Sequence, residues 1–240
     1  MEQQVKPFIN FLPGSHLILG EAGSGKTRLI CSLLQSKNFY EENSVNIVLT
    51  DSEKRIWSKP AENPVTTIDP FSTDISWITD PTKPGIYYCA CNYAPRLITF
   101  LECLATWARQ NEEKIQNSIK VFIDYPVQLL MLPEFIEQLT RLHYISETLN
   151  NNDSHPIDIW TVLGTHKDIS PKAKLLFKNS NLILVNPFPD RWNNYLSELQ
   201  KEKSEQLKTQ LPQINQTLKD GFYYFPYNDN SFYLQDKPVE

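Results

Sequence analysis

Glycine, cysteine and methionine are scarce in this 240-residue chain, which has 7, 4 and 2 of them. No two of the cysteines (Cys31, Cys89, Cys91 and Cys103) have the two-residue gap of a zinc or redox motif. Cys89 and Cys91 are alternate residues of an apolar run, so we expect them to share one face of a strand and fill the core. A chain of this length buries enough surface to fold without disulfides or a structural metal, and a reducing, cytoplasmic setting fits.

A surplus of positive charge is also missing. The chain has 23 Lys and Arg against 28 Asp and Glu, a net charge of -5 and a pI near 5.5. Domains coated with positive charge for nucleic acid usually have a pI above about 9, so any contact with DNA must come from a local basic patch. The sequence has no apolar run of about 18 residues and no secretory leader, and we expect a protein that neither spans a membrane nor is secreted.

Three of the few glycines lie within six positions. Gly20, Gly23 and Gly25 belong to the string GEAGSGKT, which follows a short apolar run and precedes an apolar pattern with the spacing of one helix face. Strand, glycine loop and helix, in this order, are the context that a phosphate-binding loop requires. The glycines allow backbone N–H groups to surround a phosphate, and the helix N-terminus adds partial positive charge. The sequence therefore predicts a nucleotide site at this loop.

Each residue of the loop has an expected role in binding ATP and Mg²⁺. Lys26 would reach the β- and γ-phosphates, and the Thr27 hydroxyl would hold the metal ion. A second metal-side carboxylate is expected at the end of a neighbouring buried strand, where Asp124 follows the run IKVFI. The residues predicted to contact the nucleotide are Gly20, Glu21, Ala22, Gly23, Ser24, Gly25, Lys26, Thr27 and Arg28.

Apolar runs and helical patterns alternate along the chain, which predicts an α/β fold with a mainly parallel sheet and helices on both faces. The expected strands are 16–19, 45–50, 86–91, 119–124, 157–164 and 182–185. The expected helices begin at Lys26, near residue 97, near Pro133 and at Pro171. The stretch 59–84, rich in Pro, Ser and Thr, is interpreted as a loop or an irregular insertion.

The character of the sequence changes after Pro189. A long amphipathic helix is expected over 190–210, with a packing role favoured over partner binding, and two aromatic runs around Asn228 predict a hairpin over 221–236. We interpret the whole chain, 1–240, as one domain with a core over 14–188 and these two elements as appendages.

Four features in this order resemble the FtsK/HerA branch of P-loop ATPases, which includes DNA translocases, conjugation and secretion ATPases and genome-packaging ATPases. They are the GEAGSGKT loop, the VFID strand, the end of the TVLGTHKD strand and the segment KLLFKNSNLILVN. The resemblance spans about residues 14–236 and implies a RecA-like P-loop sheet, ATP hydrolysis and assembly into an oligomer. It also implies a polar γ-phosphate sensor, here His166, followed by an asparagine, here Asn179 or Asn181.

One departure from this family concerns hydrolysis itself. The family has a glutamate directly after the Mg²⁺ aspartate to polarise the attacking water, whereas this chain has Tyr125. In related folds the base projects from the end of an adjacent strand, and Asp51, just after the run VNIVLT, is the first substitute. His166 in place of the usual glutamine keeps a hydrogen-bond donor but makes the contact sensitive to pH.

The resemblance also implies an arginine that completes a neighbour's site, because its charge stabilises the transferring phosphate. Arg141 is the first candidate, ahead of Arg96 and Arg191. A small basic cluster after the sensor strand is the candidate contact for double-stranded DNA, and a solvated surface is its alternative. It comprises Lys167, Lys172, Lys174 and Lys178.

The leading hypothesis from the sequence is therefore an oligomeric ATPase motor acting on double-stranded DNA. The alternative is a nucleotide-dependent switch or adaptor with little or no hydrolysis, which the missing glutamate favours. A small-molecule kinase is disfavoured because the second half has no arginine-rich lid. A GTPase is disfavoured because the string THKD lacks the residue order that recognises guanine.

Overall fold

The computed structural model describes most of the sheet and its helices. The described residues are 9–21, 23–36, 39–41, 43–50, 63, 65–69, 83–91, 93–111, 118–124, 127–151, 157–164, 171–185, 205, 221–227 and 233–236. Apart from residue 205, the helix expected over 190–210 lies outside this part of the chain.

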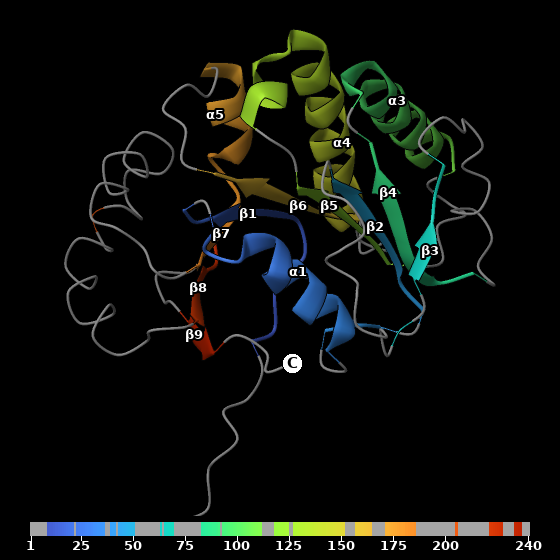
Figure 1. The fold of residues 1–240 in the computed structure, drawn as a ribbon. Helices are drawn as coiled ribbons and strands as arrows, with labels where there is room; N and C mark the ends of the chain where they lie inside the picture. Colours follow the sequence, from blue (N-terminus) through green and yellow to red (C-terminus); the bar gives the residue numbers. More distant parts are fainter. Residues whose placement is uncertain are drawn as a thin grey trace, which may run out of the picture.

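A nine-stranded sheet, in the order β3-β4-β2-β5-β6-β1-β7-β8-β9, forms the centre of the molecule (Figure 1). Every pair from β3 to β7 is parallel, whereas β8 and β9 pair antiparallel. The strands are β1 (Ser15–Leu19), β2 (Val45–Thr50), β3 (Val65–Thr67), β4 (Gly85–Ala90), β5 (Ile119–Asp124), β6 (Ile157–Leu163), β7 (Asn181–Val185), β8 (Gly221–Phe225) and β9 (Tyr233–Asp236). The predicted α/β class, the parallel sheet and the terminal hairpin are confirmed.

Helices cover both faces of the sheet, as predicted. In Figure 1, α1 (Lys26–Gln35) lies on one face, and α3 (Ala94–Gln110), α4 (Pro133–Asn151) and α5 (Pro171–Phe177) lie on the other. A short 3-10 helix, η3 (Val127–Met131), leads into α4. Helices on both faces bury the parallel strands completely, which explains why β2, β6 and β7 are runs of buried residues without polar alternation.

The two faces of the sheet have different cores. The face under α1 is rich in aromatic side chains, with Phe122, Trp160 and Tyr224 among its buried members. The face under α3, α4 and α5 is mainly aliphatic, and its helices bury leucines such as Leu101 and Leu139. Cys89 and Cys91 lie in this second core, which confirms their predicted role.

The interpretation of 59–84 as a loop or an irregular insertion was wrong at three residues. Val65–Thr67 forms β3, an edge strand that pairs in parallel with β4. Its side chains are half-buried or exposed, so the segment lacks the apolar signal of a strand. The segment is a strand because all three of its residues pair with β4.

Membrane insertion finds no support among the described helices. None of them is both long enough and apolar enough to cross a bilayer.

Candidate nucleotide-binding site

The carboxyl ends of the parallel strands form the edge of the sheet on which the site lies. β6 lies between β1, which leads into the glycine loop, and β5, which ends at Asp124. Asp124 is flanked in register by Thr50 on β2 and Val162 on β6. Because ligands of open α/β sheets bind outside the carboxyl ends of the strands, this edge is where a nucleotide site is expected.

Backbone conformation in the loop depends on glycine at three points. Gly23 and Gly25 have φ values of 78° and 88°, a region that side chains with a Cβ rarely adopt. At Gly20 the reason is close packing, since a Cβ would lie 2.5 Å from Ser24 Oγ and 3.2 Å from Val185 Cβ and would require these neighbours to shift.

The N-terminus of α1 is open to an anion. Its first turn contains no acidic residue, and Gly25 at the N-cap provides no side-chain hydrogen bond. The first N–H groups of a helix have no partner within the helix and carry partial positive charge. A phosphate fits here because it would accept these hydrogen bonds.

Lys26 begins α1 and folds back over the loop. Its Nζ donates to the carbonyl oxygens of Gly20 at 2.8 Å and Glu21 at 2.6 Å. Burial lowers the pKa of its ammonium group, and the carboxylates of Asp124 and Glu21 oppose this effect. The ammonium group therefore lies over the loop, and phosphate oxygens can replace its two carbonyl acceptors.

Thr27 and Asp124 come together although they are 97 positions apart in the sequence. The Thr27 hydroxyl donates to Asp124 Oδ2 at 2.5 Å. One hydroxyl and one carboxylate are hard oxygen donors, and Mg²⁺ is usually held by one or two such groups, with phosphate oxygens and waters in its other positions. The described residues contain no cluster of three or more His, Cys, Asp or Glu that would hold a metal without a nucleotide. The pair fits a Mg²⁺ that arrives with a phosphate.

Cys31 is a neighbour of this site that sequence reasoning did not assign. It lies one helical turn after Thr27 on α1, and this i+4 spacing was the available signal. Burial raises the pKa of the thiol to about 12, and the Asp124 carboxylate adds to the effect. The thiol therefore stays protonated and is an uncharged neighbour of Asp124.

Three of the predicted site residues, Ala22, Asp51 and His166, lie outside the described residues, as does Tyr125, which stands in place of the expected glutamate. The strands that lead to two of them are described. Thr50, which precedes Asp51, is buried beside Asp124, and β6, which leads toward His166, runs between the loop strand and the Asp124 strand. Arg28 is described, and it is an exposed residue of the first turn of α1.

The arginine candidates for a role between subunits differ in what the structure describes of them. Arg141 is an exposed residue of α4, on the opposite face of the sheet from α1, and its Nη1 donates to Gln138 Oε1 at 3.2 Å. Arg96 is exposed near the start of α3, and Arg191 lies outside the described residues.

The asparagine candidates lie near the amino end of β7, whereas the loop lies at the carboxyl ends of the strands. Asn181 is the first residue of β7, opposite His16 near the start of β1, and its Oδ1 accepts a hydrogen bond from the Tyr227 N–H at 2.8 Å. Asn179 precedes it in an exposed turn. Neither contacts this chain's own loop. Both lie at or before the start of β7, whereas the loop follows the carboxyl end of β1, which is parallel to β7.

Three of the four lysines of the predicted basic cluster are described. Lys172 and Lys174 lie on α5, and Lys178 directly follows it. Lys172 and Lys178 are exposed, and Lys174 is half-buried. Lys167 lies outside the described residues.

The sheet order and the loop together define the fold of a P-loop NTPase, in which one strand separates the loop strand from the aspartate strand. Solved structures with this fold include the genome-packaging NTPase B204 from Sulfolobus turreted icosahedral virus 2 in complex with AMPPCP, with a TM-score of 0.57 and 11% identity over 95% of this chain and 99% of that chain. B204, the DNA-packaging ATPase from Sulfolobus turreted icosahedral virus, has a TM-score of 0.55 and 15% identity over 95% and 98% of the two chains.

A lower similarity, with a TM-score of 0.46 and 8% identity over 95% of this chain and 24% of that chain, is to the cytoplasmic domain of the Thermomonospora curvata type VII secretion ATPase EccC. No protein-family model and no curated protein matches the sequence. The resemblance found in the sequence to P-loop ATPases of this branch is confirmed at the level of the fold.

Proposed function

We propose that this protein binds ATP with Mg²⁺ and hydrolyses it, and that it works as an oligomeric motor on double-stranded DNA. The observation that carries the nucleotide half is the joining of Thr27 to Asp124 at 2.5 Å beside an uncapped helix N-terminus. The DNA half is supported by the lysines around α5 and by the similarity in fold to proteins whose names describe genome packaging.

The residues of the loop have separate tasks in this proposal. The N–H groups at the start of α1 bind and orient the phosphates, and Lys26 exchanges its two carbonyl partners for the β- and γ-phosphate oxygens. Thr27 and Asp124 would hold Mg²⁺, which supplies positive charge to the phosphate oxygens when bound. Phosphoryl transfer depends on positioning and charge neutralisation, so these contacts carry most of the catalysis.

The attacking water needs a hydrogen-bond acceptor, and Tyr125 is not a carboxylate. Asp51 is our candidate for the base because it follows Thr50, the register partner of Asp124 on the adjacent strand. His166, shortly beyond the end of β6, is our candidate sensor of the γ-phosphate because β6 lies between the loop strand and the aspartate strand.

Arg141 is our candidate for an arginine that acts between subunits. It is exposed on the face of the sheet opposite α1, so it would stabilise the transferring phosphate of a neighbouring copy. Hydrolysis would then depend on assembly.

A nucleotide-dependent switch is the second candidate function, and Tyr125 at the position of the family's glutamate favours it. Such a protein would bind ATP through the same loop and hydrolyse it slowly or not at all. The two functions differ in turnover, not in binding.

The deciding experiment measures ATP binding and phosphate release, with and without a linear DNA duplex, for the wild type and for Lys26→Ala and Asp51→Ala. Glu102→Ala, an exposed carboxylate on α3, is the matched control for Asp51→Ala. The motor predicts turnover that DNA stimulates and that both variants lose, while the control keeps it. Tight ATP binding without turnover under any condition would leave the switch. No ATP binding by the wild type would exclude both.

Two further measurements test the remaining assignments. The mass in solution, with and without ATP, shows whether a neighbour's Arg141 is available, and a strictly monomeric protein would contradict the role in trans. Changing Lys172, Lys174 and Lys178 to Glu together should abolish stimulation by DNA and preserve basal turnover. Unchanged stimulation would exclude the basic cluster as the DNA contact.

A further inference from the structure

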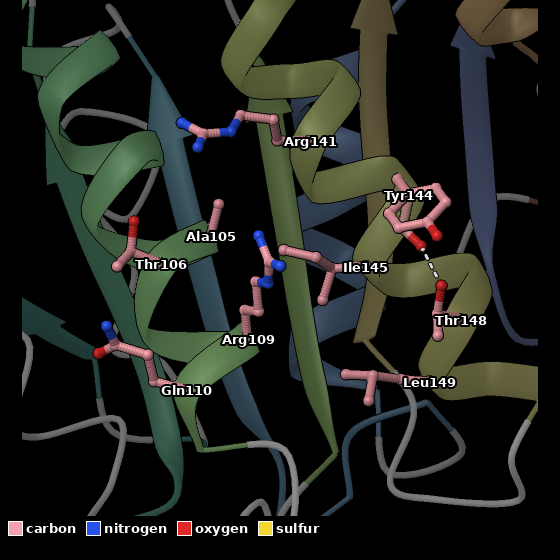
Figure 2. Close-up of a pocket in the computed structure, with 9 residues that line it drawn as sticks. All are labelled: Ala105, Thr106, Arg109, Gln110, Arg141, Tyr144, Ile145, Thr148 and Leu149. Atoms are coloured by element: carbon pink, nitrogen blue, oxygen red, sulfur yellow. Dashed lines mark hydrogen bonds between the residues drawn. The ribbon is translucent and has the colours of Figure 1, made fainter.

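A groove runs between α3 and α4 on the face of the sheet opposite α1. Its volume is about 670 Å³, within the range of sites that take substantial ligands. Both helices contribute to it, with Thr106 and Arg109 from α3 and Arg141 and Tyr144 from α4 (Figure 2). The groove is separate from the nucleotide site, which lies at the carboxyl ends of the strands.

Two arginines converge on this groove. Arg109 belongs to the last turn of α3, Arg141 to the middle of α4, and Figure 2 shows both guanidinium groups in the space between the helices. Both residues are exposed. Arg141 donates to the neutral Gln138, and among the described residues neither arginine forms an ion pair. Two adjacent guanidinium groups that form no ion pair with the described residues are suited to bind carboxylate or phosphate groups.

The rest of the groove distinguishes between these two anions. No Asp or Glu is among its described lining residues. Ala105 and Leu149 form its buried floor, and its accessible apolar surface comes from the half-buried Ile145 and from Tyr144, which is 71% exposed. A peptide with apolar and acidic residues would cover Ile145 and Tyr144 and pair with the arginines.

The neighbouring groove between α4 and α5 argues against a continuous track for DNA. Its lining includes Glu137 and Glu147 along with Lys172. Arg141 lines this groove too, so the carboxylates lie near one of the two arginines, and they would repel a phosphate backbone laid across all three helices. The positive charge of the α3/α4 groove is therefore local, which suits a short acidic segment.

We propose that the α3/α4 groove is a docking site for an acidic, amphipathic segment of a partner protein. Carboxylates of the segment would pair with Arg109 and Arg141, and its apolar side chains would cover Ile145 and Tyr144. This inference goes beyond the proposed ATPase. Arg141 is shared between the two proposals, but Arg109 belongs to the groove alone, so Arg109 separates them.

The test is a selection of displayed random 15-residue peptides on the full-length protein without nucleotide. Bound sequences should be enriched in Asp and Glu combined with Leu, Ile or Phe. Selected peptides, labelled with fluorescein, should bind Arg109→Gln at least about tenfold more weakly by fluorescence anisotropy. Arg109→Gln keeps a good helix former on an exposed site, and circular dichroism verifies its fold. Arg96→Gln, the same change at an exposed site of α3 outside the groove, is the matched control and should bind normally.

Several outcomes would overturn the proposal. Selected peptides without carboxylates, or equal binding to the wild type and Arg109→Gln, would exclude charge-directed docking. Displacement of the peptides by a 20-base-pair duplex, with the duplex itself depending on Arg109, would assign the groove to nucleic acid. Loss of self-association in Arg109→Gln would assign it to a second copy of the chain. ATP turnover does not enter this measurement, so its result is independent of the proposed function.

Discussion

The two ends of the central strands differ in the surroundings of their charged side chains. Strand β5 has one charged residue near each end. Lys120, near its amino end, and Asp124, its last residue, lie on the same face because alternate residues of a strand do. Lys120 is buried at 5% exposure, and its Nζ lies 2.9 Å from Glu41 Oε1 and 4.7 Å from the centre of the Phe39 ring. At the carboxyl end, Lys26 donates to two backbone carbonyls of its own loop.

Other polar groups at the amino end are buried within the fold as well. Asp158, the register partner of Lys120, accepts a hydrogen bond from the Gly14 N–H at 2.6 Å, and burial raises the pKa of its carboxyl to about 6. His16 stacks on Trp160 with ring centres 3.9 Å apart, and burial lowers the pKa of its imidazole to about 3. At the amino end the charge of Lys120 is thus paired within the fold, while burial disfavours the charged forms of His16 and Asp158, whereas Lys26 at the carboxyl end remains able to exchange partners.

The largest effect that separates the two ends is expected from Lys26→Ala. Loss of the ammonium group should reduce ATP turnover by about 10²–10³-fold, because a preorganised charge on the phosphates is removed. The free energy of unfolding in urea should change by less than about 0.5 kcal/mol, since only loop carbonyls lose a partner. A large loss of stability would mean that Lys26 is structural, like Lys120.

The second effect is a dependence of stability on pH at the amino end. His16 has a folded pKa of about 3 against 6.5 in the unfolded chain, so the unfolded state gains a proton first and stability falls as the pH drops below 6.5. Each pH unit between these values contributes about 1.4 kcal/mol. Relative to the wild type, His16→Phe should therefore gain about 3 kcal/mol between pH 6.5 and 4, measured by urea unfolding.

Asp158 contributes a pH dependence of stability opposite in sign to that of His16, so it provides the control for that measurement. Its folded pKa of about 6 lies above the ordinary value of 3.8, so its contribution to the stability of the fold falls as the pH rises from 3.8 to 6. Asp158→Asn should change relative to the wild type in the opposite direction, losing ground as the pH falls from 6 to 4. Parallel profiles for the wild type and both variants would contradict the two assignments.

A smaller effect is expected when the charge of Lys120 is removed. Lys120→Ala should lower the free energy of unfolding by about 2 kcal/mol, because a hydrogen-bonded charge and its packing on Phe39 are lost, while Glu41 can return to water. ATP affinity should stay within about twofold, since the residue lies at the other end of β5. Lys178→Ala, at an exposed lysine, is the control for stability, and an equal loss there would contradict a specific role for Lys120.

The smallest effect concerns the backbone of the loop. Gly23→Ala should cost about 1 kcal/mol of stability, because its φ of 78° strains a residue with a Cβ although no atom lies within 4 Å of the new methyl group. Gly164→Ala, at a glycine with equally open space and no positive φ, should be neutral. Thermal unfolding of the two variants measures this difference, and an equal loss of stability in both would exclude backbone strain as the explanation.

Much of the fold could be predicted from local pattern. The runs around Ile18, Val48, Phe122 and Ile183 became strands because consecutive apolar residues bury both faces of a parallel strand. Leu29, Ile30, Leu33 and Leu34 became the buried stripe of α1 for the same periodic reason. β3 could not be predicted, because three half-exposed residues are a strand only through pairing with β4.

The candidate site divides in the same way. The glycines, Lys26 and Thr27 are contiguous, so their motif is visible in the sequence, and Asp124 was predicted as a strand-end carboxylate. The contact of Thr27 with Asp124 depends on a sheet order that places β6 between their strands, which no local pattern encodes. The position of Asn181 at the far end of β7 and the convergence of Arg109 on Arg141 were equally invisible.

The sequence by itself therefore determined the elements, the phosphate loop and the chemistry that the loop can perform, because these depend on neighbours along the chain. Only the tertiary structure decided which charges are buried and compensated and which remain available. Lys120 and Lys26 are the same residue type at the start of apolar segments. One lies under Phe39 beside Glu41, and the other lies over a loop of carbonyls, because burial and partners are set by contacts between distant segments.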